Sequence, residues 1–181
     1  MRKKFLGVKL VADEENMKIN LFFYMAFALL CAVPALADEI VVKDGDSLEI
    51  GERRIRLDGI DAPEYPQICL NKEGREYPCG KEALQFLENL TAGKEVDCRC
   101  LPHKDRYHRE ICECFVGDIC INGAMISAGW AVAYRDKTYL SREKDAKENK
   151  RGIWQGKFMR PAIYRVLYRE KLKTALESNP K

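Results

Sequence analysis

The ten residues Ile55-Arg-Leu-Asp-Gly-Ile-Asp-Ala-Pro-Glu64 are the stretch that decides the fold of this 181-residue chain. Apolar and charged residues alternate strictly at its start, which is typical of a β-strand with one face toward a core. We therefore expect Arg56 on the accessible face of that strand, where it can contact a ligand. A glycine and Pro63 then break the strand, so Asp61 and Glu64 fall on the loop that follows.

Two further charged segments supply the rest of the candidate site. Asp44-Gly-Asp46-Ser lies upstream of this stretch, and Asp105-Arg-Tyr-His-Arg109 lies far downstream. Asp46 and Asp61 are short carboxylates on separate loops, and such oxygen ligands suit a hard cation. We expect the main-chain carbonyl of Ala62 to complete the ligand set, with Asp44 supporting it from outside the coordination shell. Because no His or Cys is among these positions, the pattern favours calcium (Ca²⁺) over zinc or copper.

The remaining charged residues match the needs of phosphodiester hydrolysis. Glu64 follows a proline that fixes the chain direction, and it can orient or deprotonate the attacking water, a role worth about 10²–10⁴-fold in rate. Arg56 and Arg109 carry planar guanidiniums that can each bind two phosphate oxygens. Taken singly, an Asp-Gly-Asp is usually a turn and an Arg/Glu pair is usually a surface ion pair. Their joint occurrence is what predicts a site.

The rest of the chain reads as one small domain with extensions at both ends. We expect two strands within 40–50 joined by a turn at 44–46, a strand at 54–58, a loop at 65–79, a helix at 81–90, strands at 96–101, 107–116 and 119–121, a short helix capped by Asn122, and a polar helix at 141–151. This order predicts a mainly β protein with flanking helices (α+β), built on a small closed sheet.

The two ends of the chain differ from the domain between them. Residues 17–37 hold an apolar run and end in a small-x-small pattern, so we predict a signal peptide over 1–37, with Met17 as a candidate true start and cleavage before Asp38. The alternative is an uncleaved membrane anchor. Export through the Sec route would place the protein in the periplasm or outside the cell, with no membrane contact beyond the signal segment.

The C-terminal extension, residues 157–181, is basic and partly helical by its pattern. Residues 157–173 carry six Lys/Arg and one Glu. One interpretation is a solvated helix that packs on the domain, and the other is an auxiliary phosphate-binding patch. The whole chain has a formal charge of only +3, of which residues 1–37 contribute +2. Any hold on nucleic acid must therefore come from local patches.

Seven cysteines follow the predicted signal segment, and export favours their oxidation. Cys69 and Cys79 flank the long loop after Glu64, where a bridge would brace the site. An antiparallel hairpin would place further cysteines opposite one another, giving the pairs Cys98–Cys114 and Cys100–Cys112, with Cys120 left over. The alternative is a four-thiolate zinc site. A redox protein is disfavoured because the chain has no Cys-x-x-Cys motif.

Five segments, in order, resemble the staphylococcal nuclease family over about residues 39–156: Val42–Leu48, Ile55–Glu64, Asp105–Arg109, Ile121–Ala131 and Lys150–Trp154. The resemblance implies a five-stranded OB-fold barrel with about three helices, here followed by the C-terminal helical extension. It also implies a calcium-dependent endonuclease that cleaves DNA and RNA with little sequence specificity and leaves 3′-phosphate ends.

The resemblance also implies roles for individual residues. The catalytic trio would be Arg56, Glu64 and Arg109, and the calcium ligands would be Asp46, Asp61 and the Ala62 carbonyl. Substrate would contact Tyr107, Tyr134 and Arg106, although packing is an equal alternative for the two tyrosines. We expect single-stranded substrates to be preferred and the protein to be a monomer without a stable protein partner.

Two departures from the family stand out. His108 lies where the family has glycine, and a positive φ there would carry a cost, although histidine tolerates that region better than most residues. The cysteines resemble those of an exported bacterial branch with Cys-x9-Cys after the Ala-Pro-Glu motif. The rival function is a non-catalytic OB-fold module that binds single-stranded nucleic acid without cutting it.

Overall fold

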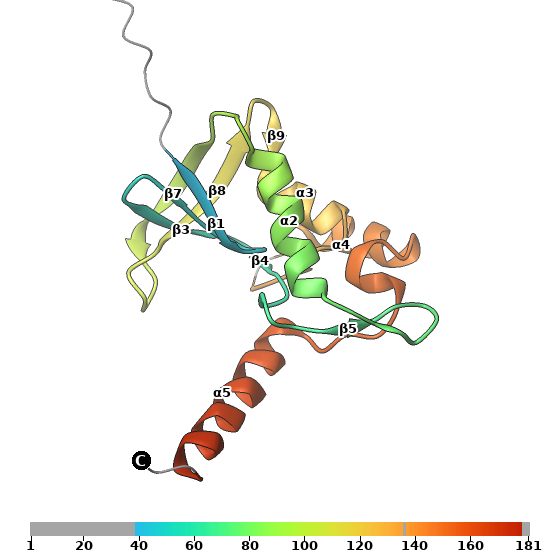
Figure 1. Cartoon of the computed structure of the whole chain (residues 1–181). Coiled ribbons are helices and arrows are strands. Elements are labelled where there is room, and N and C mark those ends of the chain that lie inside the picture. The colour runs from blue at the N-terminus through green and yellow to red at the C-terminus, as the bar shows by residue number, and fades with distance from the viewer. Residues whose placement is uncertain (1–38, 136, 179–181) are drawn as a thin grey trace, which may run out of the picture. The chain divides into compact units, whose positions relative to one another are not determined.

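The computed structural model describes residues 39–135 and 137–178, so the predicted signal segment lies outside the described residues. A mixed sheet forms the body of the domain (Figure 1). Its strands are β1 (Ile40–Asp44), β2 (Ser47–Ile50), β3 (Arg53–Leu57), β7 (Asp97–Lys104), β8 (Glu110–Val116) and β9 (Ile119–Cys120).

The pairing order of this sheet is β1-β2-β3-β8-β7, with β9 added to β8. Neighbours are antiparallel except β3 and β8, which run parallel. This five-stranded order, with one parallel pair, is the Greek-key strand arrangement of an OB-fold. Within the described residues no assigned ladder joins β7 back to β1. The fold class expected from the sequence is confirmed.

In the part of the chain that the structure describes, three helices flank the sheet, as expected, and a fourth follows the domain (Figure 1). They are α2 (Cys79–Thr91), α3 (Ile121–Ser127), α4 (Leu140–Glu148) and α5 (Pro161–Glu177), with a short 3₁₀ turn at Gly152–Gln155 before α5. Two small two-stranded ladders lie beside the main sheet: β4 (Ile60–Asp61) with β10 (Val132–Ala133), and β5 (Cys69–Leu70) with β6 (Glu76–Tyr77).

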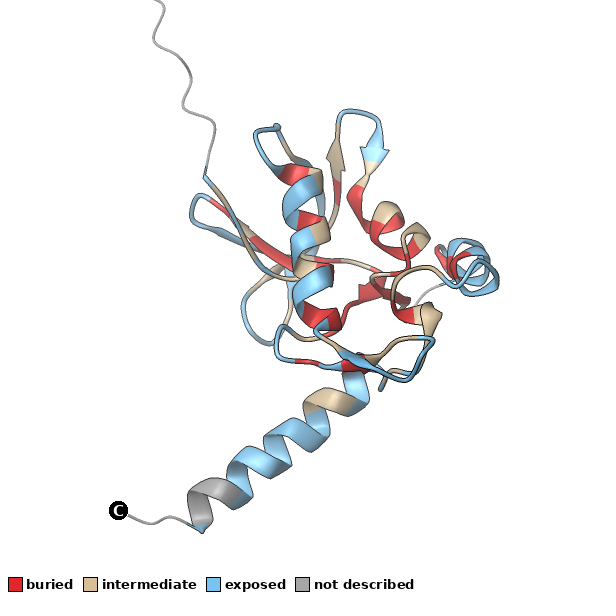
Figure 2. Cartoon of the chain, turned by 45° about the vertical axis from the view of Figure 1, so that its right-hand side comes forward, coloured by how far each residue is buried: buried red, intermediate tan, exposed pale blue. Residues whose placement is uncertain are grey.

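The core follows from the alternation in β3. Ile55 and Leu57 are fully buried, whereas Arg56 between them is half-buried on the opposite face. Leu48 from β2, Leu87 from α2 and apolar residues of α3 complete the same cluster. Figure 2 shows the buried residues gathered where the sheet meets α2 and α3, while α5 is exposed along most of its length. The apolar contacts therefore hold the sheet and place the polar face of β3 outside the core.

The structure differs from the sequence-based expectation at two places. The segment 65–79 is not a plain loop, because it contains the β5–β6 hairpin. The cap of α3 is Cys120, whose sulfur accepts a hydrogen bond from the Gly123 N–H, and not Asn122. Asn122 is buried, and its amide instead bonds the Cys114 N–H and two main-chain carbonyls. A side chain that is already satisfied inside the core cannot also cap the helix.

The described part of the chain contains three disulfides: Cys69–Cys79, Cys98–Cys114 and Cys100–Cys112. The last two lie at directly paired positions of β7 and β8, as the hairpin register requires. Because these four cysteines are bonded to each other, they are not free to act as zinc thiolates, and the bridges are favoured over the zinc alternative. Cys120 keeps a free thiol. Three bridges in one small domain are typical of an oxidising environment.

Among the described residues, no helix combines the length and the apolar character that crossing a membrane requires.

Candidate active site

Two ion pairs join three separate segments at one end of the sheet. Arg56 on β3 places its Nη1 atom 2.9 Å from the carboxylate of Asp46, which lies in the β1–β2 turn. The Nη2 atom of the same guanidinium is 3.3 Å from Oδ1 of Asp61, at the end of β4. Both carboxylates are buried, at 3% and 1% exposure. The structure thus brings together three of the residues that the sequence analysis singled out.

Close backbone approach makes this arrangement possible. A Cβ atom added at Gly45 would come within 2.7 Å of the Ala62 Cβ and 2.9 Å of the Ala83 Cβ, so only glycine lets the β1–β2 turn meet the acidic loop and α2. The Ala62 N–H can then donate to Oδ2 of Asp46 at 3.3 Å. At Gly80, an added Cβ would collide with the main-chain carbonyl of Glu64. Two glycines therefore let the segments that carry Asp46 and Glu64 pack closely.

The electrostatics around Asp46 are unfavourable for its ionised form. Burial raises its pKa well above the ordinary value, and the neighbouring carboxylates Asp44 and Asp61 add to that effect, while Arg56 opposes it. Asp44 also accepts a hydrogen bond from the Asp46 N–H at 2.9 Å. For Arg56, burial opposes the charge, but Asp46 and Asp61 together raise its pKa. The site is a crowded set of carboxylates held by a guanidinium.

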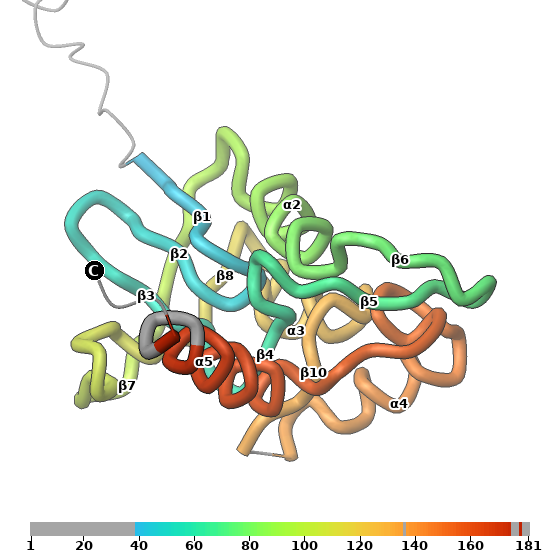
Figure 3. The backbone as a smooth tube through the Cα atoms, turned by 60° about the horizontal axis from the view of Figure 1, so that its bottom comes forward, coloured from blue at the N-terminus to red at the C-terminus, as the bar shows by residue number. Residues whose placement is uncertain are grey.

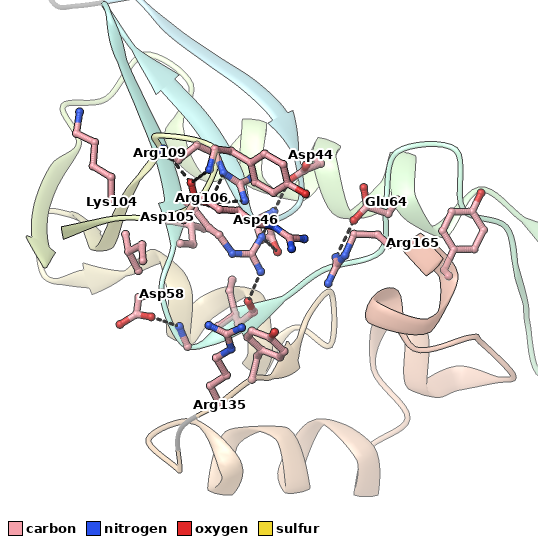
Figure 4. A pocket seen from close by; sticks show the side chains of 18 of the residues that line it. Asp44, Asp46, Asp58, Glu64, Lys104, Asp105, Arg106, Arg109, Arg135 and Arg165 are labelled. Carbon is pink, nitrogen blue, oxygen red and sulfur yellow. Dashed lines mark hydrogen bonds and ion pairs between the residues drawn. The ribbon is translucent and has the colours of Figure 1, made fainter. Parts of the chain in front are cut away.

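Glu64 is held by a residue that sequence reasoning did not anticipate. Arg165, in α5, places Nη1 2.7 Å from Oε1 of Glu64 and Nη2 2.8 Å from Oδ1 of Asp61. Figure 4 shows Glu64 and Arg165 pointing toward one another across the site. Burial works against the charge of Arg165, but the contacts with these two carboxylates raise its pKa. One guanidinium therefore fixes both the predicted water activator and a predicted calcium ligand.

Arg109 is positioned by its own turn. The Asp105 carboxylate accepts hydrogen bonds from the Arg109 Nε and Nη2 atoms at 2.9 and 2.8 Å, and from the main-chain N–H groups of Tyr107 and Arg109. Burial raises the pKa of Asp105, but these hydrogen bonds outweigh it and leave the pKa lowered. His108 within the turn adopts φ = 61°. This is the left-handed conformation expected at a position where the family has glycine.

These groups face one cavity of about 830 Å³. Its walls come from the β1–β2 turn, β3, the loop after β4, the β7–β8 turn and α5. The predicted residues among them are Asp44, Asp46, Arg56, Glu64, Arg106, Tyr107, Arg109 and Tyr134. Asp61 and Ala62 lie behind this surface and do not line it. His108 is likewise not a lining residue.

The aromatic residues at the rim are paired with arginines. Tyr107 is 47% exposed and carries the guanidiniums of Arg106 and Arg109 near its ring, at 4.9 and 5.4 Å from the centroid. Tyr134 carries Arg135 in the same way, at 4.9 Å. Both tyrosines are therefore available at the cavity wall and are not core residues.

Comparison with known proteins identifies the family. Residues 54–156, more than half of the chain, match the family described as staphylococcal nuclease homologue. The chain belongs to the staphylococcal nuclease family. It is 38% identical over 130 residues to the succinoglycan biosynthesis protein ExoI of Rhizobium meliloti (strain 1021), a match that covers 68% of this chain and 66% of that protein.

Two further relatives carry nuclease names. The chain is 31% identical over 130 residues to the probable endonuclease LCL3 of Komagataella phaffii, covering 64% of this chain and 55% of the relative. It is 30% identical over 114 residues to the probable staphylococcal-like nuclease CAN1 of Oryza sativa subsp. japonica, covering 61% of this chain and 31% of that relative. The chain thus spans from about a third to two thirds of the length of these relatives.

The family match leaves part of the site outside its bounds. It begins at residue 54, after Asp46, and it ends at residue 156, before α5. Arg165 therefore lies in the C-terminal extension, beyond the residues that match the family. The signal for it in the sequence is the repeat of Tyr-Arg at 164–165 and 168–169, which places both pairs on one helix face.

Proposed function

We propose that this protein is a nuclease that hydrolyses phosphodiester bonds of DNA and RNA with little sequence specificity, using calcium and leaving 3′-phosphate ends. The observation that carries the proposal is the convergence of Arg56, Glu64 and Arg109 from three distant segments on one cavity. Membership of the staphylococcal nuclease family and the nuclease names of relatives support it.

The two guanidiniums suit the binding of a phosphodiester. Arg56 is fixed by two carboxylates and Arg109 by one, so neither needs to be ordered when substrate arrives. Each presents a planar set of N–H donors that can bind two phosphate oxygens, and both can neutralise the charge that grows on those oxygens in the transition state. Lysine would keep the charge but lose this geometry.

Glu64 suits the activation of water. Its Oε1 atom is occupied by Arg165, and within the described residues no hydrogen-bond partner reaches its Oε2 atom. That second oxygen can accept the proton of a water molecule as the water oxygen bonds to phosphorus in line with the 5′-oxygen. The bond between phosphorus and the 5′-oxygen then breaks, the 5′-oxygen takes up a proton from solvent water, and the phosphate stays on the 3′ side.

The donor set around Asp46 fits a hard divalent cation. Four carboxylates, Asp44, Asp46, Asp61 and Glu64, face two guanidiniums, so the ionised cluster carries a net charge of −2 before a cation binds. Asp46, Asp61 and the Ala62 carbonyl would hold calcium through oxygen atoms alone. When bound, the ion would supply positive charge beside the phosphate oxygens.

The proposal also covers the preferred substrate strand, the oligomeric state and the location of the protein. The tyrosines and arginines at the cavity rim, Tyr107, Tyr134 and Arg106, suit unpaired bases and phosphates, which supports a preference for single strands. We also propose that the protein acts as a monomer after export to the periplasm or the medium. The disulfides support export, whereas residues 1–37 lie outside the described structure.

Digestion of a 5′-labelled single-stranded oligonucleotide tests the proposal. The purified protein should cleave it in calcium and stop on addition of a chelator, and a phosphatase that removes 3′-phosphates should shift every product band. Oligonucleotide binding without cleavage in calcium would instead support the non-catalytic binding module and contradict the proposed activity.

A further inference from the structure

Helix α5 is attached to the catalytic end of the domain by contacts at several points. The main chain pairs Lys157 with Leu70, through hydrogen bonds of 2.8 and 2.9 Å. Gln67, which is fully buried, donates to the Met159 carbonyl at 2.7 Å, and Tyr164 donates to the Pro66 carbonyl at 3.3 Å. Figure 3 shows α5 running past β4, consistent with the ion pair between Arg165 and Asp61.

These contacts reach the part of the domain that carries Glu64. The segment 66–70 begins two residues after Glu64, and Cys69 within it is bonded to Cys79 at the start of α2. The disulfide thus fixes the segment to which the start of α5 is tied, while Arg165 returns to Glu64 from the helix itself. Because contacts fix both the segment just before α5 and the first turns of the helix, α5 presents a defined face to the cavity.

That face carries two tyrosines and two arginines. Tyr164, Arg165, Tyr168 and Arg169 all line the cavity that also holds Arg56 and Arg109. Because residues four apart lie on one side of a helix, the tyrosines and the arginines form two parallel rows. The rings of Tyr164 and Tyr168 are stacked, with centroids 5.6 Å apart and planes 14° apart. Tyr168 is the outer ring of this stack, and 40% of its surface is exposed.

The two arginines have different tasks. Arg165 is committed to Glu64 and Asp61. Arg169, one turn further along, has no ion-pair or hydrogen-bond partner among the described residues and is exposed at the cavity wall. An unpaired guanidinium beside an open aromatic stack is the combination by which proteins bind single strands, with rings contacting bases and cations contacting phosphates.

We propose that α5 is a second wall of the substrate groove: Tyr168 and Tyr164 stack a base of the single strand that flanks the scissile phosphate, and Arg169 binds the adjoining phosphate. This rests on the proposed function, because it takes the same cavity to be the substrate site. The proposal favours the phosphate-binding interpretation of the basic extension. The contacts of Tyr164 and Arg165 attach the helix to the domain, and Tyr168 and Arg169 one turn further along stay exposed.

Binding of a labelled single-stranded DNA oligonucleotide in chelator, followed by fluorescence anisotropy, tests this wall without cleavage. Tyr168→Ala should weaken binding by about 5- to 100-fold, the usual effect of losing one base–aromatic stack. Tyr168→Phe keeps the ring and should bind like the wild type. Circular dichroism shows whether each variant keeps its helix content.

A matched pair of charge changes tests Arg169. Arg169→Gln should reduce the slope of log affinity against log salt by about 0.7, as expected for one lost phosphate contact on a single strand. Lys171→Gln removes the same charge from α5 at a residue that does not line the cavity, and its affinity should change by less than about twofold.

Two results would overturn the inference: wild-type affinity in both Tyr168→Ala and Arg169→Gln, or equal losses in Arg169→Gln and Lys171→Gln. Cleavage in calcium is measured in a separate assay for the wild type and the variants. If the wild type binds through α5 but does not cut in calcium, the proposed function fails and this wall stands. If it cuts while the α5 variants bind normally, only the wall fails.

Discussion

The guanidinium of Arg165 lies 2.7 Å from the carboxylate of Glu64, although 101 residues separate them in the sequence. This pair joins the C-terminal extension to the middle of the family domain, and the same guanidinium reaches Asp61. The extension therefore contributes a side chain to the candidate site. The proposed calcium ligand Asp61 and the proposed water activator Glu64 share this one positive partner.

Arg165→Gln should lower stability by about 1–2 kcal/mol in chelator, an amount discounted for the partial exposure of the pair. The variant leaves Asp61 and Glu64 without their shared cation. Excess calcium should recover part of this loss, because the ion supplies positive charge beside Asp61. Thermal unfolding of the variant and the wild type, with calcium and with chelator, measures both effects. An equal deficit in the two conditions would contradict a calcium site at Asp61.

Arg56→Lys should cost about 2 kcal/mol of stability and most of the activity, because lysine cannot bond Asp46 and Asp61 at once. Arg54→Lys is the matched control, since Arg54 lies two residues away on the same strand and is exposed. We expect the control to change stability by less than about 0.5 kcal/mol. Chemical denaturation measures the stability of both variants. Similar losses of stability would show that the two-pronged guanidinium of Arg56 is unimportant.

Asp105→Asn should destabilise the protein at neutral pH, with a deficit that shrinks in acid. Hydrogen bonds from Arg109 and Tyr107 lower the pKa of Asp105 in the folded state despite its desolvation. Its contribution is therefore present above the unfolded value of about 3.9 and is lost as pH falls through the lower folded value. The gap in melting temperature should stay constant from pH 7 to about pH 4 and shrink as the pH falls further toward about 2. A gap that stays constant over this whole range would mean that the charge of Asp105 is not what stabilises the turn.

His108→Gly should raise stability by about 0.5–1 kcal/mol, because the residue has φ = 61°, where a Cβ atom is strained and glycine is not. Part of the gain is offset by the greater freedom of glycine in the unfolded chain. Equilibrium denaturation gives the difference. A loss of stability would indicate that the His108 side chain makes a contact that outweighs its backbone strain.

Local patterns in the sequence predicted much of this molecule, and the reasons are physical. Alternation in β3 fixes which face carries Arg56, and the register of β7 and β8 pairs the cysteines, since both follow from the geometry of neighbouring residues. The cap of α3 was assigned wrongly because the choice between Cys120 and Asn122 depends on which side chain the core already uses.

Arg165 was missed for a similar reason. Whether its basic helix is solvated or faces the site depends on long-range contacts, such as those of Lys157 with Leu70 and of Gln67 with the Met159 carbonyl. The position of Asp61 behind the cavity surface, and not on it, also depends on tertiary packing. The Tyr-Arg repeat in the helix was the available signal for Arg165, although it does not indicate which helix face contacts the domain.

Cleavage by Glu64→Gln tests the central claim most directly, because it removes the proton acceptor while keeping the shape of the side chain. The variant, the wild type and Glu73→Gln, an exposed glutamate of the β5–β6 hairpin loop, are compared on one single-stranded oligonucleotide in calcium, with binding measured separately in chelator. We predict that Glu64→Gln binds within about threefold of the wild type and cleaves about 10²–10⁴ times more slowly, while Glu73→Gln cleaves normally. Undiminished cleavage by Glu64→Gln would contradict the account.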